Sequence, residues 1–556
     1  MSSESAIREM KNQWLSCPAM PEELLKELRE MSPEAEHDSF YRSLAFGTGG
    51  LRGVLGAGTN RMNLFTVAKA TRGLGSYLKT QSDAPSCAVS YDSRIHSQDF
   101  AELTAAVLAS MGIRVHLYPR LMPTPMLSYA VRRLGATAGV MVTASHNPAK
   151  FNGYKVYGSD GCQITLEAAD RILGFISAEP DLTEHLPSLQ DGLNSGLVRY
   201  ISEDTVEAYY QDIWKLRIQP SDCPLHVVYS PLNGTGNLPV REIMRRMGNI
   251  RVDVVGPQEL PDGHFPTCPY PNPEIRAAME LAIQKTVETG ADLCFATDPD
   301  CDRMGAGVRQ GDDVVLISGN DMGILMLDYL CRHKRPGSLP FVVVKTIVST
   351  EMAVPICARY NVELRNVLTG FKFIGEQIGL LEKEGQRDRF LFGFEESYGY
   401  LSGTDVRDKD AVNAALLLCE LASNLKAEGK TLLSRLEELR REYGCFAQRL
   451  LTFEYEGEDG SRRMQGIMEA LRSPSLSGRD ERLLSAERVD YLAGIGALPK
   501  SDVLEFHLPG GFKFIIRPSG TEPKLKAYLF AQAPTQPEAE NSLDDLESLV
   551  SSLCRA

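Results

Sequence analysis

A strand–helix alternation that starts three times along the chain limits its fold more than any other feature. Residues 87–145 predict strand, helix, strand, helix and strand, and the alternation starts again near residues 225 and 340. In each of the three units a strand runs into a loop rich in polar side chains. In open α/β sheets ligands bind beyond the carboxyl ends of strands, so we expect these loops to carry the function.

The ends of the chain follow other patterns. After about residue 440, hairpin-like runs such as 511–521 and 524–533 predict a smaller α+β domain, and the first 40 residues predict a charged helical extension. A chain of 556 residues is too long for one hydrophobic core, which agrees with three or four domains.

Charge and cysteine content exclude several classes of function. The formal net charge of −14 argues against a nucleic-acid or membrane-surface partner, but not against a small anionic ligand. The twelve cysteines form no CxxC pair, so we expect neither a cysteine-rich zinc site nor a disulfide framework. With no apolar run of ~20 residues and no signal-peptide pattern at the N-terminus, the sequence predicts a soluble protein of the reducing cytoplasm.

The segment "TDPDCDR", 297–303, places Asp298, Asp300 and Asp302 at alternate positions beyond an apolar strand. In an extended loop this spacing turns the three carboxylates the same way, and a divalent cation would remove their repulsion. The alternative is a polar turn whose aspartates cap local N–H groups. Because histidine and cysteine ligands are absent from the segment's alternate positions, Mg²⁺ is favoured over Zn²⁺. Arg303 is then a candidate for binding an anion near the metal.

The segment "TASHNPAKFNGYK", 143–155, raises the question of what Ser145 does. It has no base three residues away, and adjacent side chains such as that of His146 are expected to diverge on an extended chain. A serine near a Mg²⁺ site is better explained as a phosphate carrier, with the phosphoserine activated for transfer to a hydroxyl.

Five further segments carry weaker signals. Taken alone, each of them could be an ordinary turn. They are "FGTGGLRG" (46–53), "LTGFKFIGE" (368–376) with "DVRDKD" (405–410), "GFEESYGY" (393–400) and "RPSGTEPKLK" (517–526).

Together, "TASHNP", "DPDCDR", "GFEES" and "RPSGTEP" occur in an order that resembles the α-D-phosphohexomutase superfamily, which includes phosphoglucomutases and phosphomannomutases. The motifs spread from residue 143 to 523. The N-terminal extension, "FGTGGLRG" and "FPTCPYPNPE" (265–274) are most similar to the long phosphoglucomutase-2/phosphopentomutase-like branch.

The resemblance implies an α/β fold with three similar α/β sandwich domains with mixed sheets and a smaller C-terminal α+β domain around a central cleft. The predicted boundaries are 1–205 for the extension and phosphoserine domain, 206–318 for the metal-binding domain, 319–440 for the sugar-binding domain and 441–556 for the phosphate-binding domain.

The resemblance also implies roles for individual residues. Ser145, as phosphoserine, starts the reaction, and Mg²⁺ is held by the serine phosphate and the three aspartates. Lys155 moves the hydroxyl proton, with His146 and Arg52 in the same catalytic set. Relatives often carry aspartate where this chain has Gly49, which departs from the pattern beside Arg52. The implied substrate-binding residues are Arg303, Thr369, Gly370, Lys372, Glu395, Ser397 and Lys409, with Arg517, Ser519, Gly520 and Thr521 for the distal phosphate.

The resemblance therefore implies a phosphoglucomutase that interconverts glucose 1-phosphate and glucose 6-phosphate through glucose 1,6-bisphosphate. "GFEES" favours glucose because it is more similar to the "GEES" of glucose enzymes than to the "GEMSGH" of dual mannose/glucose enzymes. The alternatives are a phosphomannomutase or phosphopentomutase, a phosphosugar phosphatase, and a non-catalytic phosphosugar-binding protein. We expect a monomer or small homo-oligomer.

Overall fold

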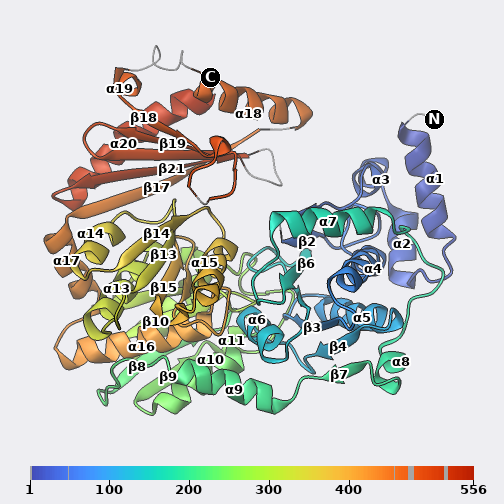
Figure 1. The fold of residues 1–556 in the computed structure, drawn as a ribbon, viewed down its shortest axis with the longest axis horizontal. Helices are drawn as coiled ribbons and strands as arrows, with labels where there is room; N and C mark the ends of the chain where they lie inside the picture. The colour runs from blue at the N-terminus through green and yellow to red at the C-terminus, as the bar shows by residue number, and fades with distance from the viewer. Residues whose placement is uncertain are drawn as a thin grey trace. The chain divides into compact units, whose positions relative to one another are not determined.

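The computed structural model describes residues 3–47, 49–455, 457–473, 481–496, 498–518 and 524–555 (Figure 1). The chain divides into two compact units. Unit 1 consists of Met1–Met322 and Phe371–Gly429, and unit 2 consists of Gly323–Gly370 and Lys430–Ala556.

Unit 1 begins with the helical extension that the sequence predicts. Its helices are α1 (Ser3–Leu15), α2 (Glu22–Glu30) and α3 (Pro33–Phe40). Trp14 is 1% exposed, and its ring centroid lies 5.5 Å from those of Phe40 and of Phe65 in α4 (Leu64–Gln81). This aromatic cluster attaches the extension to the first α/β domain.

The first α/β domain contains a seven-stranded mixed sheet in the order β1-β2-β6-β5-β3-β4-β7. Strands β5, β3, β4 and β7 run parallel, whereas β1, β2, β6 and β5 pair antiparallel. Beside α4, its elements are β1 (Phe46–Gly47), β2 (Gly50–Val54), β3 (Ser86–Tyr91), α5 (Ser97–Ser110), β4 (Arg114–Leu117), α6 (Thr124–Arg133), β5 (Ala138–Val142), β6 (Phe151–Gly158), α7 (Leu166–Ser177), α8 (Leu189–Asn194) and β7 (Val198–Tyr200).

Both faces of this sheet are buried. On β3, Cys87 and Val89 join the large core that also contains Leu74 of α4, while Ala88 packs with Leu127 of α6 on the other side. Every residue of β3 is buried, as expected where helices cover both faces of parallel strands. The strands therefore end at fixed positions, and the loop after β5 begins from a rigid base.

A second mixed sheet has the order β12-β11-β10-β8-β9. Its strands β9, β8 and β10 are parallel, and β10, β11 and β12 are antiparallel. The elements are α9 (Glu203–Trp214), β8 (Leu225–Ser230), α10 (Asn237–Met247), β9 (Ile250–Val254), α11 (Gly256–Glu259), α12 (Arg276–Thr289), β10 (Leu293–Thr297), β11 (Met304–Gln310) and β12 (Asp313–Ile317).

The helix α16 (Ala411–Ala427) is largely buried within unit 1. It packs against α10, β8 and β11 of the second sheet and against β16 (Gly399–Leu401). Every residue from Ala411 to Ser423 is buried, including the polar Asn413 and Glu420. Unit 1 also contains the antiparallel pair of β15 (Phe390–Glu395) with β16, and α15 (Phe371–Lys383).

Unit 2 contains a parallel strand pair and the C-terminal sheet. Helix α13 (Gly319–His333) leads to the pair formed by β13 (Val342–Thr346) and β14 (Glu363–Val367). The C-terminal sheet is wholly antiparallel, in the order β17-β21-β20-β19-β18, and α20 packs on β17 and β21 (Figure 1). The remaining elements are α14 (Ala353–Arg359), α17 (Leu432–Tyr443), β17 (Cys445–Glu454), α18 (Gly457–Arg472), α19 (Glu481–Leu484), β18 (Glu487–Asp490), β19 (Leu504–Leu508), β20 (Phe512–Pro518), β21 (Lys524–Ala533) and α20 (Gln536–Arg555).

The elements agree with the sequence prediction of α/β units followed by an α+β segment. Among the described residues, no helix combines the length and the apolar composition needed to span a bilayer.

Candidate active site

Ser145 lies in the loop that follows β5, where the sheet of the first domain ends. Its backbone has φ 52°, in the left-handed region that non-glycine residues rarely adopt. The Ser145 amide donates to Thr143 Oγ1 over 2.8 Å, and the hydroxyl donates to Asp298 Oδ2 over 2.8 Å. The side chain is therefore aimed at the aspartate loop of the second domain.

The expectation that the side chains of Ser145 and His146 diverge is wrong. Nδ1 of His146 lies 3.2 Å from the serine Oγ. The expectation assumed an extended chain, whereas the positive φ of Ser145 turns the next residue back toward it. Burial, together with the nearby Arg303 and Arg52 guanidinium groups, holds the pKa of His146 well below its usual value, so the ring is neutral at pH 7.

Arg94 fixes the serine loop, and the sequence analysis did not identify it. Its guanidinium donates to the carbonyls of Ser145, Asn147, Pro148 and Phe151, the last two over 3.0 and 3.1 Å. Arg94 is 3% exposed, so these bonds are made away from water. The available signal in the sequence was that the predicted strand in "CAVSYDSR" (87–94) ends in polar residues.

Asp92 connects the Arg94 clamp to the serine itself. Its carboxylate lies 3.4 Å from Arg94 Nε and accepts hydrogen bonds from Thr143 Oγ1 (2.6 Å) and Ser97 Oγ (2.7 Å). Thr143 Oγ1 in turn accepts a hydrogen bond from the Ser145 amide. The Asp92 carboxylate therefore supports the backbone of Ser145 through the side chain of Thr143.

The aspartate loop joins β10 to β11. Cys301 has φ 54°, and its amide donates to the Asp298 carbonyl over 2.9 Å, which closes the turn. Asp298 Oδ1 accepts the amides of Asp302 (3.0 Å) and Arg303 (2.9 Å). The local hydrogen bonds expected of a polar turn are therefore present, but they use mainly one of the three carboxylates.

The other two carboxylates each have one oxygen that accepts no hydrogen bond. Asp300 Oδ1 and Asp302 Oδ1 are buried without a hydrogen-bond partner. One oxygen from each of Asp298, Asp300 and Asp302 can be chosen so that all three lie within 4.8 Å of one another. Three convergent, buried oxygen ligands fit a hard divalent cation, so the triad could bind a metal ion.

The protein charges alone leave the triad electrostatically strained. Burial and the repulsion of Asp300 and Asp302 raise the pKa of Asp298 well above its usual value. Burial also opposes ionisation of Asp300, but the Lys155 ammonium together with the hydrogen bonds that Asp300 accepts outweighs it and holds the pKa of Asp300 far below the usual range. A bound cation would lower the repulsion on Asp298.

Two lysines point into this carboxylate cluster. Lys155 of β6 lies 2.8 Å from Asp300 Oδ2 and 3.7 Å from Asp302 Oδ2. Lys409, just before α16, lies 3.1 Å from Asp302 Oδ2 and 3.2 Å from Asp408 Oδ1. Burial alone would lower the pKa of Lys409, but the surrounding carboxylates, Asp302 first, outweigh it and raise that pKa.

Buried tyrosine and glutamine side chains fix Asp408, the partner of Lys409. Tyr157 donates its hydroxyl to Asp408 Oδ2 over 2.8 Å, and Gln163 Nε2 lies 3.3 Å from the same oxygen. Tyr157 stands two residues beyond Lys155 on β6, so the two side chains leave the same face of the strand.

Arg303 and Glu395 each pair with Gly399 of β16. Arg303 donates to Glu274 Oε1 over 2.6 Å, and its backbone forms a bridge with Gly399 of β16. Glu395 is 5% exposed and closes the end of β15. Burial raises the pKa of Glu395 to about 7; Lys409 opposes this rise and the neighbouring Glu396 adds to it.

Arg52 lies on β2, next to β6 in the sheet, and donates to Asn147 Oδ1 over 3.3 Å. It therefore reaches the serine loop, and its catalytic role, which the resemblance implies, stays a prediction. At Gly49, a Cβ atom would lie 3.0 Å from Gln163 Oε1. The side chain of Gln163 thus borders the space that an aspartate at position 49 would need.

The remaining predicted residues fall into three groups. Ser397 and Lys372 belong to unit 1, and burial lowers the pKa of Lys372. Thr369, Gly370 and Arg517 belong to unit 2, where Arg517 donates to Tyr528 over 3.5 Å. Ser519, Gly520 and Thr521 lie outside the described residues.

Comparison with known proteins identifies the fold family. The family descriptions phosphoglucomutase/phosphomannomutase, alpha/beta/alpha domains I, II and III, match residues 43–182, 207–311 and 318–443. A phosphoglucomutase of Staphylococcus epidermidis is 35% identical over 540 residues, covering 94% of this chain and 96% of its own. The chain belongs to the phosphoglucomutase/phosphomannomutase family.

Solved structures agree on the fold. The open form of the Paramecium phosphoglucomutase pp63/parafusin aligns with a TM-score of 0.68 at 16% identity, covering 92% of this chain and 96% of that one. An Aspergillus fumigatus N-acetylphosphoglucosamine mutase, solved with GlcNAc-6P and magnesium, aligns with a TM-score of 0.51 at 16% identity, covering 92% and 96%. The predicted superfamily and the three α/β domains with a C-terminal antiparallel domain are confirmed, while the exact boundaries stay a prediction.

The raised pKa of Glu395 predicts a pH-dependent stability. Because the folded pKa of about 7 lies above the usual 4.5, the folded state favours the protonated acid, and its contribution to stability is lost as pH rises from 4.5 to 7. Glu395→Gln removes this loss, which is on the order of 3 kcal/mol. Between pH 5 and pH 8, the unfolding temperature of the metal-free wild type should therefore fall relative to that of metal-free Glu395→Gln.

The exposed Glu384 supplies the control. The difference in unfolding temperature between Glu384→Gln and the wild type should be the same at pH 5 and pH 8. An equal wild-type-to-Glu395→Gln difference at pH 5 and pH 8 would show that Glu395 ionises normally in the folded protein.

Proposed function

We propose that this protein is a phosphoglucomutase that interconverts glucose 1-phosphate and glucose 6-phosphate through a phosphoserine at Ser145 and glucose 1,6-bisphosphate. The observation that carries the proposal is the 2.8 Å contact of the Ser145 hydroxyl with Asp298, inside a buried aspartate triad that two lysines approach. The phosphoglucomutase relative, matched over nearly its whole length, supports the same reaction.

The metal proposed for the triad is Mg²⁺, held by Asp298, Asp300 and Asp302 together with the phosphate on Ser145. Oxygen ligands without histidine or cysteine favour it, and the related Aspergillus enzyme was solved with magnesium. When bound, it would neutralise charge on the phosphoryl group during transfer.

The chain's own residues would carry the rest of the chemistry. A sugar hydroxyl attacks the phosphorus, the bond from phosphorus to Ser145 Oγ breaks, and the hydroxyl proton ends on Oγ. We assign the movement of this proton to Lys155. The neutral ring of His146 lies 3.2 Å from the freed serine oxygen, whose hydroxyl donates to Asp298.

Binding of the sugar phosphate is assigned to the cationic and polar residues around the triad. Lys409, Arg303 and Arg52 supply positive charge, and Glu395 with Ser397 supplies acceptors for sugar hydroxyls. Lys372 and, from unit 2, Thr369, Gly370, Arg517, Ser519, Gly520 and Thr521 complete the proposed set. The bisphosphate would turn around and return its other phosphate to Ser145.

Two alternatives use the same geometry. A phosphomannomutase or phosphopentomutase would differ in sugar preference, which the ratio of kcat/KM for the glucose, mannose and ribose 1-phosphates decides. A phosphatase would release inorganic phosphate instead of the isomer. We further propose a cytoplasmic location, in line with twelve unpaired cysteines, and a monomer or small homo-oligomer.

Ser145→Ala should abolish mutase activity. The substitution removes the phosphate carrier, and loss of a covalent nucleophile commonly lowers kcat by several orders of magnitude. A coupled assay of glucose 1-phosphate to glucose 6-phosphate measures this, with Ser110→Ala on the exposed end of α5 as the matched control. Mutase activity above one-tenth of wild type in pure Ser145→Ala protein would exclude the phosphoserine mechanism.

Asp300→Asn should weaken Mg²⁺ binding about tenfold or more, because an amide replaces one of three charged ligands. Isothermal titration calorimetry measures the affinity directly, without turnover. Asp312→Asn, in the exposed turn between β11 and β12, should bind Mg²⁺ like the wild type. Unchanged Mg²⁺ affinity in Asp300→Asn would mean that the triad is a structural turn.

A further inference from the structure

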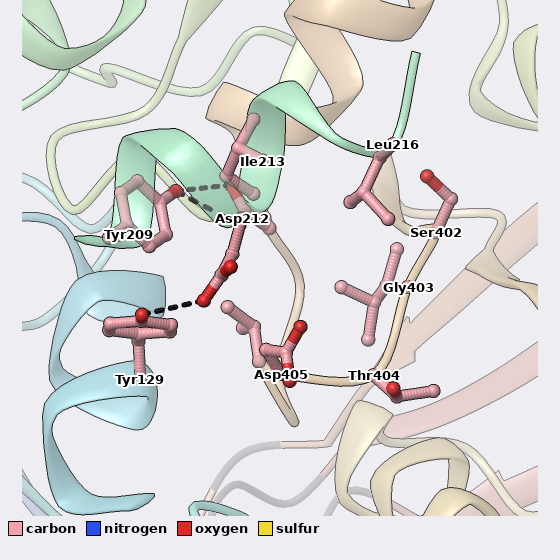
Figure 2. A pocket seen from close by; sticks show the side chains of 12 residues that line it. Tyr129, Tyr209, Asp212, Ile213, Leu216, Ser402, Gly403, Thr404 and Asp405 are labelled. Carbon is pink, nitrogen blue, oxygen red and sulfur yellow. Dashed lines mark hydrogen bonds between the residues drawn. The ribbon is translucent and has the colours of Figure 1, made fainter. Parts of the chain in front are cut away.

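A small cavity in unit 1 lies beside the segment that carries Lys409. Its lining includes Tyr129 of α6, Tyr209 and Asp212 of α9, and Asp410. Its volume is about 10 Å³, room for a single water. Figure 2 shows the Tyr129 hydroxyl directed at Asp212, with the 402–405 segment on the other side of the cavity.

Tyr209 binds the carboxylate of Asp410. Its hydroxyl lies 2.9 Å from both carboxylate oxygens, and both residues are fully buried. Asp410 also accepts the amides of Val412 and Asn413, each over 2.9 Å, as the N-cap of α16. The Asp410 carboxylate thus joins the start of α16 to Tyr209 of α9.

Asp410 is the residue next to Lys409, and its backbone is also fixed. The Asp410 amide donates to the Tyr400 carbonyl over 3.0 Å, and the Ala411 amide donates to the carbonyl of Cys301 in the aspartate loop over 3.3 Å. The peptide that carries Lys409 is therefore followed by a residue held through its backbone to Tyr400 and through its side chain to Tyr209.

We propose that Tyr209 is a positioning residue for Lys409 and acts through Asp410. The inference rests on the proposed function, in which Lys409 binds the sugar phosphate. Without the Tyr209 hydroxyl, Asp410 loses a buried hydrogen bond and the start of α16 can shift. A small displacement of the Lys409 ammonium from its place 3.1 Å from Asp302 then lowers the rate, since phosphoryl transfer depends on alignment.

The first test compares two tyrosines of the same cavity. Tyr209→Phe keeps the ring and removes the hydroxyl, and it should lower kcat/KM for glucose 1-phosphate about tenfold. Tyr129→Phe removes the hydroxyl that binds Asp212, a residue of α9 whose other hydrogen bond is with Lys215 among the described contacts, and it should stay within about twofold of the wild type. Equal losses in the two variants would contradict the proposal.

The second test is a double-mutant cycle with Lys409→Met. If Tyr209 acts through Lys409, Tyr209→Phe should cost less than about twofold once the lysine is absent. If Tyr209→Phe instead lowers kcat/KM by the same factor in the wild type and in Lys409→Met, the hydroxyl acts through general stability, and that result would overturn the proposal. Where turnover is too slow, the same cycle is measured on the dissociation constant of glucose 1-phosphate by calorimetry.

The design separates failure of the inference from failure of the proposed function. Wild-type activity in Lys409→Met would contradict the assignment of Lys409 to the substrate site, whatever Tyr209 does. An impaired Lys409→Met with an unaffected Tyr209→Phe would contradict only the positioning. If Tyr209→Phe does not fold, Asp410→Asn, which keeps an oxygen to cap α16, should show the same dependence on Lys409, and additive losses would overturn the proposal.

Discussion

The convergence of three buried carboxylates in one loop is the constraint on which the rest of the site depends. Ionised carboxylates are costly to bury unless they are paired and hydrogen-bonded. Lys155 and Lys409 supply part of that compensation, yet oxygens of Asp300 and Asp302 remain without hydrogen-bond partners. The site therefore retains capacity for a cation, and the serine hydroxyl is placed against the same cluster.

Much of the surrounding structure holds charged groups in position. The Ser145 loop is held by the fully buried Arg94, and Lys409 stands between two aspartates that buried tyrosines bind. These supports come from different elements of unit 1, including β6 and α9. Alignment of the charged groups is thus fixed by packing and hydrogen bonding rather than by the loops alone, as phosphoryl transfer requires.

The parts of the site that depend on local sequence could be predicted. The spacing of Asp298, Asp300 and Asp302 beyond a strand predicted that their carboxylates converge, as they do in the structure. That Ser145 carries a phosphate stays a prediction. The supporting contacts could not be predicted, because their partners are far apart in sequence: Arg94 lies 51 residues from Ser145, and Tyr209 lies 201 from Asp410. The error about His146 came from assuming an extended backbone where Ser145 takes a positive φ.

The central claim is that a phosphate on Ser145 passes to a sugar hydroxyl and not to water. The most direct measurement follows the label after enzyme phosphorylated with ³²P at Ser145 is mixed with unlabelled glucose 1-phosphate and Mg²⁺ in a single turnover. The account predicts that the label leaves the protein in glucose 1,6-bisphosphate. Release of the label as inorganic phosphate at the rate seen without sugar would contradict it.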